Sequence, residues 1–170
     1  MLLGPAAMLF VYVAQITHLE ETVSRHSNES IALILLSIPF IGFLIQALLF
    51  RSDFHLFMAS LCGAFFCREW HFPGTSKGIY IALALLIFWA VKRKQTFEKI
   101  IGNGRFKIWL IATFWTYLLS QLIARRVFRY VYLPQEAEFH VFLEETVETI
   151  AHLMMITACF IAWKVKRRST

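Results

Sequence analysis

The most constraining feature of this chain is the segment Ser30–Phe50, which holds no charged residue. A helix needs roughly 17–25 apolar residues to cross the hydrocarbon core of a bilayer. Further apolar stretches recur along the whole chain, and only 16% of its 170 residues are charged against 58% that are hydrophobic. A soluble domain carries about 25% charged residues. We therefore predict an all-α, polytopic transmembrane helix bundle that forms a single integral membrane domain over residues 1–170.

The predicted spans are apolar stretches bounded by polar or charged residues. They cover residues 2–17, 30–50, 54–67, 78–91, 106–132 and 139–163. The third and fourth are short, and five spans result if they form one re-entrant hairpin. The apolar start lacks the basic flank and cleavage site of a signal peptide, so we expect it to be a retained span.

Lysine and arginine in short loops favour the cytoplasmic side of a membrane. The two largest basic clusters lie between residues 92 and 107 and between residues 164 and 168. Two predicted helices separate these clusters, so they share one side, and both termini are expected to be cytoplasmic. The formal charge of +6 is thus a topology signal, which indicates lipid contact and no nucleic-acid partner. We expect an integral protein of a bacterial inner membrane, with a second copy or another membrane protein as candidate partners.

This topology gathers the acids and histidines on the non-cytoplasmic face, apart from Asp53, Glu98 and His55. The positive-inside rule does not itself sort these residue types. Residues 140, 144, 148 and 152 are His, Glu, Glu and His, and this spacing places neighbouring members on one face of a helix. An ionisable residue at membrane depth is a functional candidate by default.

Glutamate and histidine together form a plausible ligand set for Zn²⁺ or another divalent metal. The residues of the predicted site fall into three roles. The metal ligands are Glu148, His152, His71, Glu69 and His18; the catalytic carboxylates are Glu144 and Glu145; the arginines that hold a substrate head group are Arg125, Arg126 and Arg129.

The favoured function is a metal-dependent hydrolase or transferase that acts on a lipid or lipid-linked substrate. Arginine holds phosphate or carboxylate groups in bidentate fashion, which suits such a head group. Two alternatives stay open: a small proton- or metal-coupled transporter or channel subunit, and a non-catalytic accessory protein. In the last case the outer charged layer would bind a partner. A purely structural interpretation is also open, in which Glu144, Glu145 and Glu148 pair with Arg125, Arg126 and Arg129 of the neighbouring helix.

Overall fold

The structure is a computed structural model that describes residues 25–70, 75–127 and 136–169. The described part is entirely helical and contains no strand. Its helices run in the order α2 (Arg25–Phe50), α3 (Asp53–Glu69), α4 (Thr75–Lys92), α5 (Lys94–Ile101), α6 (Gly104–Ala124) and α7 (Glu136–Ser169). The predicted all-α class is confirmed for these residues. The predicted first span, residues 2–17, lies outside them.

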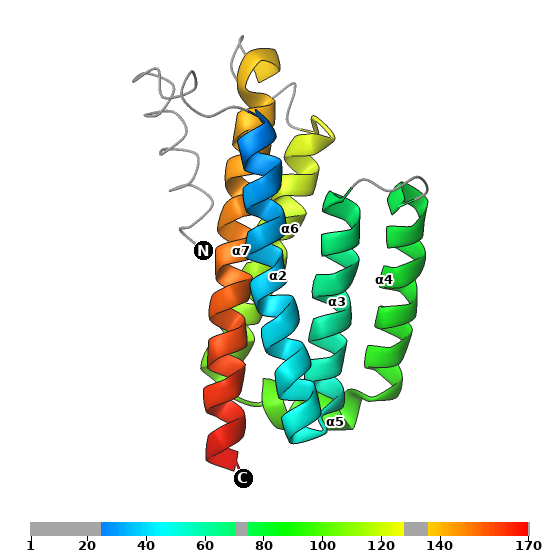
Figure 1. Ribbon diagram of the computed structural model, residues 1–170. Helices are drawn as coiled ribbons and strands as arrows, with labels where there is room; N and C mark the ends of the chain where they lie inside the picture. The colour runs from blue at the N-terminus through cyan, green and yellow to red at the C-terminus, as the bar shows by residue number, and fades with distance from the viewer. Residues whose placement is uncertain (1–24, 71–74, 128–135, 170) are drawn as a thin grey trace.

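Among the described residues, three helices are long and apolar enough to cross a membrane, namely the segments Ile31–Phe50, Gly104–Ala124 and Val141–Arg167. Their outer surfaces carry large exposed apolar side chains such as Leu48 and Ile108, as expected for a lipid-facing surface. The shorter helices α3 and α4 run beside them (Figure 1). The chain thus has the features of an integral membrane protein.

Helices α2 and α7 extend beyond the predicted spans, and two further differences concern the end of α6 and the loop before it. Helix α6 ends at Ala124, whereas the predicted span continues to residue 132; Arg126 follows with a φ of 53°, in the left-handed region that terminates helices. Helix α5 is a second difference, because the sequence predicts a basic loop there. Its Phe97 and Ile100 are buried while its lysines face outward, so this short helix lies across one end of the bundle (Figure 1).

Local signals explain where the long helices begin and end. Arg51 adopts a φ of 45° after α2, and such a residue commonly closes a helix. Asp53 then opens α3, where a carboxylate is favoured by the helix dipole. At the start of α6, the Asn103 side chain accepts a hydrogen bond of 3.1 Å from the Phe106 backbone N–H.

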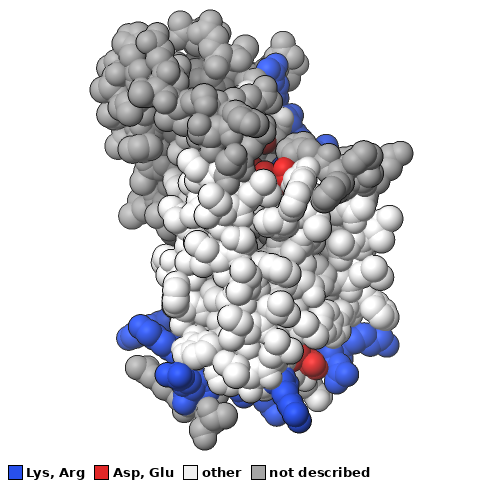
Figure 2. Space-filling model, viewed as in Figure 1, with Lys and Arg blue, Asp and Glu red and all other residues white. Residues whose placement is uncertain are grey.

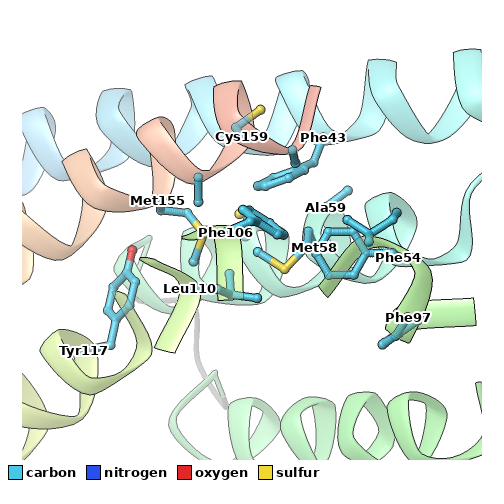
Figure 3. Close-up of a cluster of buried hydrophobic side chains, with 14 of the residues drawn as sticks. Phe43, Phe54, Met58, Ala59, Phe97, Phe106, Leu110, Tyr117, Met155 and Cys159 are labelled. Carbon is cyan, nitrogen blue, oxygen red and sulfur yellow. The ribbon is translucent and has the colours of Figure 1, made fainter. Parts of the chain in front are cut away.

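The bundle consists of helix pairs joined through α2. Helix α2 packs closely on α3 and on α7, α6 packs on α7, and α4 packs on α3. Large side chains fill the space between α3 and α6, where Phe54 meets Phe106 edge-on at 5.8 Å between ring centroids. Phe54, Phe106 and Met58 are almost fully buried and form the centre of the core (Figure 3).

Charged side chains occupy the two ends of the bundle and leave an uncharged band between them (Figure 2). We call the end that carries α5 the basic end. Its basic residues are Arg51, Lys92, Arg93, Lys94, Lys99, Arg105, Lys107, Lys164, Lys166 and Arg167. We call the opposite end, where α3 and α6 finish, the glutamate end; it carries Glu69, Glu144, Glu145 and Glu148. The basic clusters predicted to share one side do lie at the same end.

Replacing Phe106 with alanine should lower the free energy of unfolding by about 3 kcal/mol or more, because a cavity would open in the aromatic core. Phe88 is 62% exposed, so Phe88→Ala is the matched control and should change little. Reversible unfolding in mixed detergent micelles measures both values. Equal losses in the two variants would show that the aromatic cluster is not the core.

Candidate polar site at the glutamate end

The predicted row of acids and histidines lies on α7, as the spacing required. Its two deepest members are Glu148 and His152, which are one helical turn apart on the same face. The Glu148 side chain is 13% exposed, and His152 is fully buried. Both are therefore directed into the bundle, in the half that belongs to the glutamate end.

Arg68, in the last turn of α3, is the ion-pair partner of Glu148. Its Nη1 lies 3.5 Å from Glu148 Oε1, and its side chain is 30% exposed. A basic residue in the last turn is also favoured by the dipole of its own helix. This pair joins α3 to α7, two helices that approach each other through side chains.

Gln121 on α6 holds the same guanidinium from a third direction. With its amide oxygen turned toward Arg68, it accepts hydrogen bonds of 2.7 Å from Nη1 and 2.9 Å from Nη2. This orientation follows from the hydrogen-bond network, since the opposite one sets donor against donor. Arg68 is thereby fixed between Gln121 and Glu148, and its planar fork suits two simultaneous partners.

His152 lies deeper than Glu148 and contacts Tyr117 of α6. The Tyr117 hydroxyl and His152 Nδ1 share a hydrogen bond of 3.0 Å, whose direction depends on the tautomer. Tyr117 also stacks against Phe65 of α3, with the ring centroids 4.9 Å apart. The other ring nitrogen, His152 Nε2, is buried and has no hydrogen-bond partner within the described part of the chain. In a neutral ring whose Nδ1 accepts from tyrosine, Nε2 carries a proton that it can donate.

Further carboxylates surround the ion pair of Arg68 and Glu148. Glu69 lies 4.0 Å from Arg68, and Glu69, Glu144 and Glu145 are all close enough to interact electrostatically with Glu148. The structure therefore brings four of the predicted glutamates to one region. The region thus combines several carboxylates that can accept protons with one guanidinium.

The predicted arginines are placed differently. Arg125 follows α6 and donates a hydrogen bond to the Tyr80 hydroxyl of α4. Arg126 lies in the turn after it, and Arg129 falls outside the described residues. Among the described residues, the ion pair of Glu148 is with Arg68, and the pairing of the glutamates with Arg125, Arg126 and Arg129 stays a prediction.

The remaining predicted ligands, His18 and His71, also fall outside the described residues. Among the residues that are described, no group of three His, Cys, Asp or Glu side chains is arranged to hold a metal ion. The metal site therefore stays a prediction, and it would need ligands beyond Glu148, His152 and Glu69.

Below His152 most of the buried side chains toward the basic end are apolar, although Gln46 and His55 are buried there as well. Met155, Leu110 and Phe106 are buried there (Figure 3). The hydroxyl groups of Thr113 and Thr116 donate to carbonyl oxygens of their own helix. The described residues thus build a polar site at the glutamate end that is separated from the other end by the aromatic core.

Arg68, Gln121 and Tyr117 were not predicted as site residues. One signal was present, because Tyr117 and Gln121 are spaced i, i+4 on α6 just as Glu148 and His152 are on α7. The start of α6 and Lys164 of α7 both lie at the basic end. At about 1.5 Å of rise per residue, Gln121 lies roughly 25 Å from the first and Glu148 roughly 24 Å from the second, so the two pairs lie at one level.

Comparison of the chain with known protein families, with curated proteins and with solved structures finds no match. The site must therefore be interpreted from its own geometry.

Removing Arg68 should be costly, because it leaves the largely buried Glu148 without its counter-charge. We expect Arg68→Ala to lower the free energy of unfolding by roughly 2–4 kcal/mol, between the values for exposed and fully buried pairs. Adding Glu148→Gln to this variant should recover part of the loss, and the double-mutant cycle gives the coupling energy.

The matched control is Arg93→Ala at the basic end. Arg93 lies 3.6 Å from Asp53, but the two side chains are 59% and 35% exposed. This exposed pair should contribute under about 1 kcal/mol. Additive effects of Arg68→Ala and Glu148→Gln would contradict the assigned pairing.

Proposed function

We propose that the chain is an integral membrane enzyme, a hydrolase or transferase, that acts on the polar head of a lipid or lipid-linked substrate at its glutamate end. The observation that carries this proposal is the placement of Glu148 and Arg68 above the buried Nε2 of His152, which has no hydrogen-bond partner among the described residues. Proton-transferring groups and an anion-binding group thus lie together near the glutamate end of the bundle.

Each side chain has a role that its surroundings support. Arg68 binds a phosphate or carboxylate of the substrate head, because a guanidinium offers several donors in a fixed fork. Glu144 or Glu145 accepts a proton from the attacking water or hydroxyl, since both lie near Glu148 at the rim. His152 and Glu148 position the reacting group and transfer protons, with Tyr117 fixing the imidazole ring through Nδ1.

The orientation of the bundle follows from its charges. The basic end is expected to face the cytoplasm, because lysine and arginine near helix ends favour that side. The site then lies in the outer leaflet of a bacterial inner membrane. The large aromatic cluster between the site and the basic end favours an enzyme over a transporter, which needs a continuous polar path through the bundle; the few buried polar side chains there, such as Thr113 and His55, lie among apolar ones.

A divalent metal is a second component of the proposal. Glu148 and His152, one turn apart on α7, would supply ligands, and Glu69, His71 and His18 are the candidates for the remaining positions. Zinc bound in this way would lower the pKa of a coordinated water to about 7 and make it a nucleophile.

The proposal predicts that Glu148→Gln and His152→Gln abolish turnover while leaving the protein folded. Loss of a proton-transferring group typically lowers rates by about 10²–10⁴-fold. The assay follows conversion of a membrane lipid extract in nanodiscs by mass spectrometry. Glu98→Gln is the matched control, because Glu98 is an exposed acid on α5.

Metal content of the same samples separates the two forms of the proposal. About one equivalent of metal in the wild type, lost in His152→Gln, would establish the metal-dependent form. Turnover without bound metal would establish acid–base chemistry alone. A folded wild type that converts no lipid, or variants that keep full activity, would contradict the enzyme.

A further inference from the structure

An open groove runs between α2 and α7 in the half of the bundle nearer the basic end. Its volume is about 360 Å³, within the usual range for small-ligand sites. Its walls are almost entirely apolar, and its rim residues Ile38, Ile45 and Phe160 are 46–64% exposed on the lipid-facing surface. The groove is therefore open to the hydrocarbon of the membrane.

The floor of the groove is formed by Gln46 and Cys159. The Gln46 amide donates to the Cys159 backbone oxygen at 3.2 Å and to its Sγ at 3.0 Å. Gly42 lies beside them, and a Cβ atom at this position would come within 2.7 Å of Cys159 Sγ. Glycine thus allows α2 and α7 to approach closely at this point, as small residues do in membrane helix pairs. The Gln46 amide nitrogen is thereby turned toward α7, whereas its Oε1 is buried without a hydrogen-bond partner among the described residues.

A cation lies at the basic mouth of the groove. Trp163 lines this mouth, and the guanidinium of Arg167 lies 4.9 Å from the centre of its ring. Phe50 packs edge-on against Trp163, at 5.4 Å between ring centroids. An aromatic residue beneath an arginine is the arrangement found where hydrocarbon meets lipid head groups.

We infer that this groove binds one anionic phospholipid of the cytoplasmic leaflet, with an acyl chain in the groove and its phosphate at Arg167. The groove runs between α2 and α7, from Trp163 of α7 past Gln46 to Ile38 of α2, and the last two are roughly 12 Å apart along their helix. This length and the apolar walls suit part of an acyl chain. The cation at the mouth, in an end rich in lysine and arginine, favours an anionic head group over a zwitterionic one.

This inference is independent of the proposed function, because the groove lies in the other half of the bundle. Native mass spectrometry of the full chain tests it, with phosphatidylglycerol and phosphatidylcholine of identical acyl chains supplied at equal concentration. We expect the wild type to retain one phosphatidylglycerol per chain, at least about 5-fold in preference to phosphatidylcholine.

Two kinds of variant should remove this preference. Arg167→Gln removes the cation that would bind the head group, and Ile156→Trp fills the groove with a larger side chain. If Ile156→Trp does not fold, Ile38→Trp fills the groove from the opposite wall. Their matched controls are Arg105→Gln, at the same end on α6, and Ile108→Trp, on a side chain that is 70% exposed to lipid. Both controls should retain phosphatidylglycerol as the wild type does.

Any of four results would overturn the inference, and three of them concern the wild type or the groove-filling variants. These are equal retention of the two lipids, no retained lipid in the wild type, and retention that is unchanged in the groove-filling variants. Loss in the variants together with loss in the controls would also overturn it, because the bound lipid would then belong to the general surface.

Discussion

The arrangement of this bundle depends on how it pairs the charge on Arg68. An ionised side chain inside an apolar bundle is costly unless it finds a partner. Arg68 meets Glu148 of α7 and Gln121 of α6, so one guanidinium links three helices near the glutamate end. Helix α3 contacts α6 and α7 mainly through side chains. In the aromatic core beneath the ion pair, rings of α3 likewise pack on rings of α6. The ion pair and the core therefore fix together the level at which the polar site lies.

The sequence predicts the helices well and their neighbours poorly. The i, i+4 spacing from His140 to His152 placed Glu148 and His152 on one inward face, and the basic clusters correctly indicated one common end. The partner of Glu148 could not be predicted, because Arg68 and Arg125 both end helices at that level and only packing distinguishes them. Helix α5 escaped prediction since Phe97 and Ile100 are too few to show a helical period among lysines. The end of α6 at Ala124 depends on a left-handed turn at Arg126, for which arginine carries no signal.

The two ends of the bundle carry different charged groups, and the aromatic core separates them. At the glutamate end, carboxylates, an arginine and a buried imidazole converge on a small region. Nearer the basic end, the groove between α2 and α7 beside Gly42 has apolar walls and a cation at its mouth. Both features suit lipids, but in different ways. The first suits reaction at a polar head, and the second suits retention of an acyl chain.

The central claim is that a lipid head group enters the polar site at the glutamate end. Photocrosslinking with a phospholipid that carries a diazirine in its head group tests this most directly, using the full chain in nanodiscs. We predict that peptide mapping finds the label on Arg68–Glu69 of α3 and on Glu144–His152 of α7, and that this label is lost in Arg68→Ala. Label confined to lipid-facing residues of the bundle surface, unchanged in that variant, would contradict the account.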